Sequence, residues 1–102
     1  MMFIFGTKKN DVRYGSDDGD LIWGWNGNDW LYGKSGNDQI LGGSGDDYLF
    51  GGSGPRSRHG SYDDGDDVIK GGDGNDHIYG ENGEDILYGD DGDDYINGGN
   101  GD

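Results

Sequence analysis

The chain lacks cysteine, contains a single proline, and has only 28% hydrophobic residues among its 102 positions. Without cysteine, neither a disulfide nor a thiolate metal site can stabilise a fold. So small an apolar fraction cannot form a core of ordinary size. Basic residues are also scarce, seven against 22 acidic ones, and the net charge of -15 repels phosphate backbones. We therefore expect no nucleic-acid partner and a fold held by something other than a large core.

Long hydrophobic runs are missing too. The longest, residues 1–5, is shorter than the roughly 7–15 residues of a signal-peptide core or the about 20 of a membrane span. We expect no membrane span. An acidic chain with 25 glycines is typical of disorder, but three Trp, seven Tyr and three Phe argue against a purely solvating tail.

What the chain does have is a glycine-rich motif that recurs every nine residues. Clear copies start at Gly24, Gly33, Gly42, Tyr62, Gly71, Gly80 and Gly89. Degenerate copies start at Gly6 and Gly15, where Lys9 and Asp18 replace the fourth-position glycine. A further copy opens at Gly51, but residues 55–61 interrupt it.

Two positions of the motif are nearly constant. The eighth is aliphatic and flanked by unlike neighbours, as a short strand with one inward side chain requires. Its members are Ile22, Leu31, Ile40, Leu49, Ile69, Ile78, Leu87 and Ile96. The sixth is aspartate, and it follows glycines that permit turn conformations. Its members are Asp11, Asp20, Asp29, Asp38, Asp47, Asp67, Asp76, Asp85 and Asp94.

This pattern, GGxGxDxUx, resembles the RTX (repeat-in-toxin) calcium-binding nonapeptides of the haemolysin type. The resemblance implies an all-β fold, a parallel β-roll or right-handed β-solenoid, in which two nonapeptides form an 18-residue coil with calcium in the turns. The repeats divide the chain into an apolar N-terminal segment, a first roll, an interrupting loop and a second roll whose last repeat is truncated. Their ranges are residues 1–5, 6–54, 55–61 and 62–102.

The resemblance also implies the calcium ligands: the side chains of the nine sixth-position aspartates and main-chain carbonyls of the turn glycines. These glycines are Gly24, Gly27, Gly33, Gly36, Gly42, Gly45, Gly65, Gly71, Gly74, Gly80, Gly83, Gly89 and Gly92. All-oxygen cages of this kind suit Ca²⁺ better than Zn²⁺ or Mg²⁺. For any one aspartate, capping of its own turn is the alternative, but nine in register favour metal.

Stacking of 18-residue coils predicts which aspartates share an ion. The pairs are Asp11/Asp29, Asp20/Asp38, Asp29/Asp47, Asp67/Asp85 and Asp76/Asp94, with Asp47/Asp67 added if stacking crosses the interruption. About six Ca²⁺ would reduce the charge of -15 to about -3, so folding and binding should be one event. Residues at the fifth position, such as Asp46 and Asn75, are expected to be solvated or locally hydrogen-bonded.

The interrupted copy predicts weak points. Arg56 stands where an aspartate belongs, so the sites it would share with Asp38 and Asp76 are expected to be empty or weak. Arg13 and Arg58 fall on inward positions, where a guanidinium is costly to bury, so their half-turns should bulge, lie at an end or be displaced. We expect residues 55–61 to form an exposed loop.

Function follows from the repeats alone. His59 and His77 are the only imidazoles and no nucleophile triad fits the repeat geometry, so we expect no enzyme. In the family that the chain resembles, such repeats belong to proteases, lipases and toxins that leave the cell by type I secretion and fold outside on binding calcium. We therefore expect a secreted, extracellular calcium-folding module.

A calcium-stabilised scaffold for binding or self-association is the alternative. Counting nine-residue units assigns most aromatic outward residues to one sheet, and such a stripe is typical of a partner surface. It would contain Trp30, Tyr32, Tyr48, Phe50 and Tyr88, alongside Val68 and Ile86. Shielding of short backbone ladders by aromatics explains the stripe equally well.

Overall fold

The computed structural model describes residues 3–16, 19–34, 36–52, 66–80 and 85–98. They form ten strands of three residues each and no helix. The strands are β1 (Phe3–Phe5), β2 (Val12–Tyr14), β3 (Leu21–Trp23), β4 (Trp30–Tyr32), β5 (Gln39–Leu41), β6 (Tyr48–Phe50), β7 (Val68–Lys70), β8 (His77–Tyr79), β9 (Ile86–Tyr88) and β10 (Tyr95–Asn97). In this part of the chain no helix is long and apolar enough to cross a membrane.

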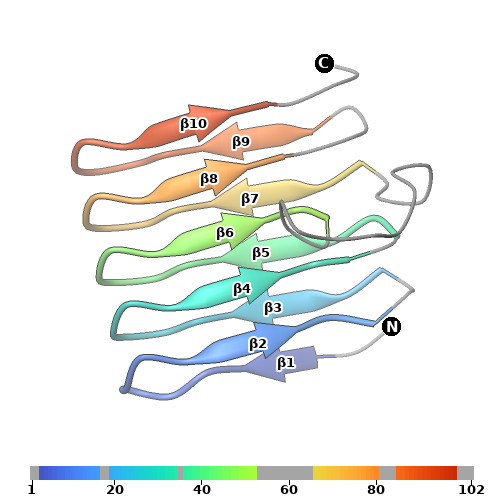
Figure 1. The fold of residues 1–102 in the computed structure, drawn as a ribbon, viewed down its shortest axis with the longest axis horizontal. Coiled ribbons are helices and arrows are strands. Elements are labelled where there is room, and N and C mark those ends of the chain that lie inside the picture. The colour runs from blue at the N-terminus through green and yellow to red at the C-terminus, as the bar shows by residue number, and fades with distance from the viewer. Residues whose placement is uncertain (1–2, 17–18, 35, 53–65, 81–84, 99–102) are drawn as a thin grey trace.

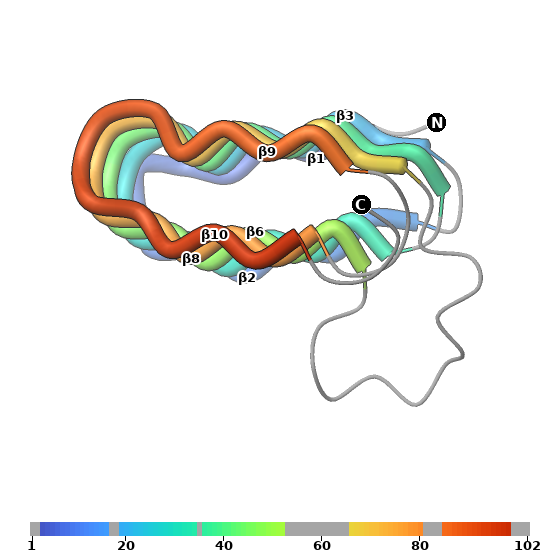
Figure 2. Tube along the Cα trace, turned by 90° about the horizontal axis from the view of Figure 1, so that it is seen from above, coloured from blue at the N-terminus to red at the C-terminus, as the bar shows by residue number. Residues whose placement is uncertain are grey.

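The strands alternate between two parallel sheets that face each other. Odd-numbered strands form one sheet in the order β1-β3-β5-β7-β9, and even-numbered strands form the other in the order β10-β8-β6-β4-β2. Figure 1 shows the coils stacked in chain order, and Figure 2, seen along the stack, shows their turns superposed. The expected all-β solenoid of parallel sheets, consistent with a β-roll, is confirmed.

The core is one column of aliphatic side chains between the sheets. The eighth-position residues of the inner strands are fully buried: Ile22, Leu31, Ile40, Leu49, Ile69 and Ile78. Ile4 and Leu87 pack against this column near its two ends. The inward positions of β2 and β10 are different, because Arg13 replaces the aliphatic residue in one and Ile96 is 47% exposed in the other. Arg13 therefore lies at an end of the stack, one of the outcomes expected for it.

The stack continues across the interrupted copy. β5 pairs with β7 and β6 with β8, so Gln39 lies opposite Val68 and Tyr48 opposite His77. Partners here are 29 residues apart instead of 18. Our expectation that the aspartates of residues 47 and 67 would pair is therefore wrong. The expected loop at 55–61, with Arg56 and Arg58, lies outside the described residues.

This longer offset also changes which sheet carries which side chains after β6. Tyr79 and Tyr95 lie on the even-numbered sheet, beside Tyr48 and Phe50. Tyr88, which the repeat count assigned to that sheet, lies on the opposite one, as do Val68 and Ile86. The count was wrong because it kept the interrupted unit as a half-coil of the stack.

The turns have two left-handed residues each. Fourth-position glycines take φ between 91° and 108°, as at Gly36 and Gly45. Second positions are left-handed as well, and at Trp25, Lys34 and Asp90 a residue other than glycine accepts φ near 70°. Glycine is required at Gly43 in particular, because an added Cβ would collide with the backbone oxygen of Trp25.

Candidate metal centre

The sixth-position aspartates form two continuous ladders, one along each edge of the stack. In each step, Oδ1 of one aspartate accepts the backbone N–H of its counterpart in the preceding coil, at 2.7–2.9 Å. The predicted neighbours Asp11/Asp29, Asp20/Asp38, Asp29/Asp47, Asp67/Asp85 and Asp76/Asp94 are all brought together. Two further steps, Asp38/Asp67 and Asp47/Asp76, cross the interruption.

These two crossing steps correct our expectation of empty sites beside Arg56. The chain does not leave an arginine in the ladder but brings the next aspartate, Asp67, into the vacant register, with Asp76 following on the other edge. Burying a guanidinium between stacked coils would cost far more than closing a longer loop, whose entropy grows only slowly with length. Every described coil thus keeps a carboxylate at each turn.

Burial isolates the second oxygen of the central carboxylates. Inner aspartates such as Asp29, Asp38, Asp47 and Asp76 are at most 1% exposed. Their Oδ2 atoms have no hydrogen-bond partner. Buried polar atoms are nearly always satisfied, so a row of orphaned carboxylate oxygens indicates a missing ligand that is positive.

The pKa values of these carboxyls reflect the same isolation. Loss of hydration, opposed by the accepted N–H bond and reinforced by neighbouring carboxylates, raises the pKa of Asp38 and Asp47 to about 8. The same causes raise the pKa of Asp76 to about 7, and burial also raises that of Asp29. A divalent cation at the orphaned oxygens would compensate the charge that burial penalises.

First-position glycines bring carbonyl oxygens to the same places. A Cβ on Gly24 would lie 2.6 Å from Asp29 Oδ2 and 2.7 Å from the carbonyl oxygen of Gly42 in the next coil. The corresponding point on Gly42 lies 2.6 Å from both Asp47 Oδ2 and the Gly71 oxygen. The absence of a side chain therefore leaves a space lined by a carboxylate and a main-chain carbonyl.

The donor set is made of oxygen alone. Within the described ranges, acidic and imidazole side chains do not gather in threes, so most ligands of a cation here would be main-chain oxygens. A hard cation that accepts six to eight oxygens in adaptable geometry fits this set. Gly65 and Gly83, two of the predicted carbonyl ligands, lie outside the described residues.

The first two turns differ from the rest. The backbone N–H of Thr7 donates to Asp11 Oδ2 at 2.6 Å, and Ser16 donates to Asp20 Oδ2 in the same way. The Thr7 N–H, with smaller help from its hydroxyl and Arg13, holds the pKa of Asp11 below its usual value despite some burial. A hydroxyl residue at the second position was the sequence signal for this arrangement, which we did not use.

Fifth-position side chains form another pair of ladders, running in the opposite sense. Asn28 Oδ1 accepts the N–H of Asp46, and Asp46 Oδ1 accepts that of Asn75, both at 2.8 Å. Here the side chain serves the following coil, whereas sixth-position carboxylates serve the preceding one. These residues bond between coils, neither solvated nor locally bonded as we expected.

Two facing parallel sheets with stacked acidic, glycine-rich turns define a metal-binding β-solenoid of nonapeptide repeats. The family model of the RTX calcium-binding nonapeptide repeat matches the chain in four copies, at residues 5–40, 26–55, 61–96 and 78–102. The chain therefore belongs to this family and is a calcium-binding repeat module, as its resemblance predicted. Comparisons with curated proteins and with solved structures found no match.

Proposed function

We propose that the chain is a calcium-responsive folding module of a protein secreted by the type I route. The orphaned Oδ2 atoms of Asp29, Asp38, Asp47 and Asp76 carry this proposal, because a fold that buries unpaired carboxylates needs a cation to be stable. Calcium is abundant outside cells and scarce in the cytosol. Such a module would remain extended during export and fold outside.

In this proposal each ion takes sixth-position carboxylates and glycine carbonyls of two neighbouring coils. About six ions would reduce the self-repulsion of a chain of charge -15. Asp11 and Asp20 would contribute least, because Thr7 and Ser16 already donate to their Oδ2 atoms. The turns after Gly24 would bind most strongly.

The test is a titration followed by circular dichroism and calorimetry, with CaCl₂ against MgCl₂. Calcium should induce parallel β-structure cooperatively, with about six ions bound per chain, and magnesium should not replace it. A chain that shows the same β-content in EDTA as in calcium would refute calcium-driven folding. Binding without any structural change would leave calcium a passive occupant of a preformed fold.

A second function, lateral association through the even-numbered sheet, is favoured by its aromatic columns. Tyr14, Tyr32, Phe50 and Tyr79 form one column with ring centroids 4.7–5.0 Å apart and planes within 11°. Trp30, Tyr48, His77 and Tyr95 form the other. The expected contiguous aromatic stripe is thus longer than the sequence count made it, although it excludes Tyr88.

The stacking also weakens this second function. Ring faces in the columns contact one another, and Phe50 in the middle is only 4% exposed, so mainly ring edges remain for a partner. The double variant Trp30→Ser, Tyr48→Ser tests it: if calcium-loaded parent and variant sediment alike at all concentrations, the columns serve the monomer alone. A parent dimer that the variant loses would establish lateral pairing.

A further inference from the structure

The exposed large hydrophobic side chains gather at the two ends of the stack. Apart from Trp25 and Trp30, they all lie on the terminal strands β1, β2, β9 and β10. They are Phe3, Phe5, Val12 and Tyr14 at one end and Ile86, Tyr88, Tyr95 and Ile96 at the other, each 46–64% exposed. An inner coil covers the same positions with its neighbours, so both ends present surface that stacking would bury.

The two ends match each other in register. If the spacing inside the stack continued from one copy to the next, β1 of the second copy would lie on β9 of the first, and β2 on β10. Phe3 would then lie opposite Ile86, Phe5 opposite Tyr88, and Val12 opposite Tyr95. These apolar pairs are of the kind that Trp30/Tyr48 makes inside the stack.

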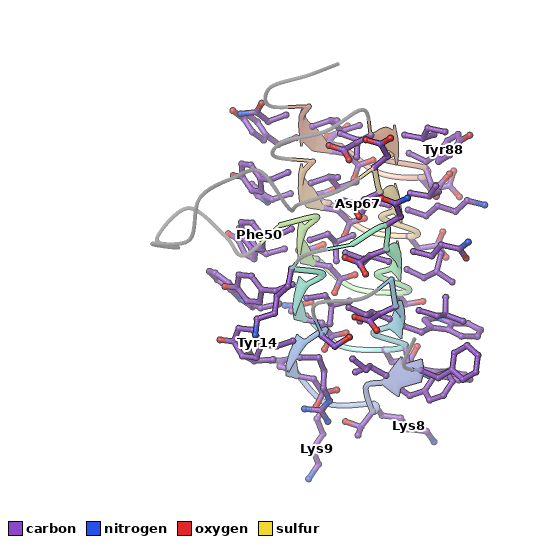
Figure 3. All side chains as sticks on the ribbon, turned by 90° about the vertical axis from the view of Figure 1, so that its right-hand side faces the viewer. Lys8, Lys9, Tyr14, Phe50, Asp67 and Tyr88 are labelled. Carbon is purple, nitrogen blue, oxygen red and sulfur yellow. The ribbon has the colours of Figure 1, made fainter. Side chains whose placement is uncertain are left out.

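The turns at the two ends carry opposite charges. Lys8 and Lys9 lie in the turn between β1 and β2 and project from the N-terminal end (Figure 3). The turn that would lie beneath them joins β9 to β10 and contains Asp90, Asp91 and Asp93, all exposed. Head-to-tail stacking would bring these turns together, whereas two like ends would repel each other.

Arg13 opposes this contact. In inner coils, the coil beneath donates N–H groups to the sixth-position Oδ1 and to the ninth-position carbonyl, as Asp11 does to Asp29 and Gly6 to Trp23. At the N-terminal end, Arg13 Nη2 lies 3.5 Å from Asp11 Oδ1, and its Nε donates to the Phe5 carbonyl oxygen at 3.5 Å. The guanidinium therefore occupies two acceptors that a second copy would need, and its side chain would face Ile96.

We propose that calcium-loaded copies of this chain stack head to tail, the N-terminal end of one on the C-terminal end of the next, and that Arg13 limits the growth of this stack. The contact is heterologous and does not close, so it produces rods of increasing length. The proposal rests on the calcium-driven folding proposed above, since only ordered coils present these ends.

The test compares the parent chain with Arg13→Ile, which restores the aliphatic residue of the motif, in CaCl₂. Removing the buried-charge penalty should strengthen association about tenfold or more, seen as concentration-dependent sedimentation and as longer rods of constant width in electron micrographs. Adding Lys8→Glu and Lys9→Glu to Arg13→Ile should return it to short particles. Circular dichroism on the same samples shows whether each variant is folded.

Three results would overturn the proposal. Arg13→Ile could remain monomeric while fully folded, or the triple variant could assemble as strongly as Arg13→Ile. Assembly could also depend on Trp30 and Tyr48 instead of the lysines, which would make it lateral. A chain that does not gain β-structure with calcium refutes the folding proposal itself, and that result is visible by circular dichroism before any sedimentation. Arg13→Lys, which keeps the charge but not the planar donor fork, is the matched control and should associate little more than the parent.

Discussion

Asp47 and Asp11 occupy the same position of their repeats but live in opposite environments. Asp47 lies in a central coil, fully buried, and loss of hydration raises its pKa to about 8. Asp11 lies in the first coil, where the Thr7 N–H lowers its pKa. In a solenoid, stability and affinity are therefore set by the number of neighbouring coils as much as by the repeat itself.

Calcium removal should reveal this difference most strongly. Without cations, the central carboxylates are buried, crowded and unpaired, so the inner coils should unfold as one unit and most β-structure should be lost. Circular dichroism with EDTA measures the loss. Retention of the inner coils with fraying at the ends alone would contradict the idea that the centre depends most on calcium.

Single aspartate variants should show the next largest effect. Asp47 contributes to two steps of its ladder, with Asp29 and with Asp76, whereas Asp94 contributes only to the step with Asp76. Asp47→Ala should therefore lose about two bound ions and Asp94→Ala about one, with the larger rise in calcium midpoint for Asp47→Ala. Calorimetric titration measures both. Equal losses would show that ions are not shared between coils.

Acid should partly replace calcium in the central coils. Folding raises the pKa of Asp38 and Asp47 to about 8 from an ordinary value of 3.8, so protonation favours the folded state. The metal-free fold should be most stable below about pH 4 and lose this stabilisation as the pH rises through about 8. Circular dichroism in calcium-free buffer at pH 4 and pH 8 tests it. More β-structure at pH 8 would reverse the sign and refute the burial argument.

The smallest effect is expected from deleting residues 53–63. The deletion joins Gly52 to Asp64 and creates the uninterrupted unit GGDGDDVIK, which keeps Asp67 and Ile69 in their present register. Ion count should not change, and the shorter connection should stabilise the calcium-loaded fold on the order of 1 kcal/mol. Thermal unfolding in calcium measures this. A loss of ions or of β-structure would mean that the deleted residues support the central coils.

Much of this arrangement was predictable from the sequence because the repeat position dictates it locally. Eighth-position residues such as Leu31 and Leu49 are buried, and sixth-position aspartates meet 18 residues apart, as the spacing predicts. Counting failed at the interruption, since whether Arg56 or Asp67 enters the ladder is a competition between burial cost and loop closure. The sheet assignment of Tyr79 and Tyr88 depends on that outcome.

The end effects could not be read from the sequence either. Thr7 and Arg13 look like degraded repeat residues, but they complete the hydrogen bonds of Asp11 and Phe5. Their role depends on the coil being terminal, which no local pattern encodes.

The junction between Gly52 and Asp66 has a consequence for protein engineering. Gly52 accepts the Lys34 N–H, and Asp66 donates to Asn37 Oδ1, so both ends of this connection are fastened to the preceding coil. The chain passes between these anchors with thirteen residues, numbers 53–65, where an uninterrupted unit has two, and the strands on either side still pair. This position is a natural port for grafting a foreign peptide, such as an epitope or a protease site, onto a scaffold that calcium can switch on.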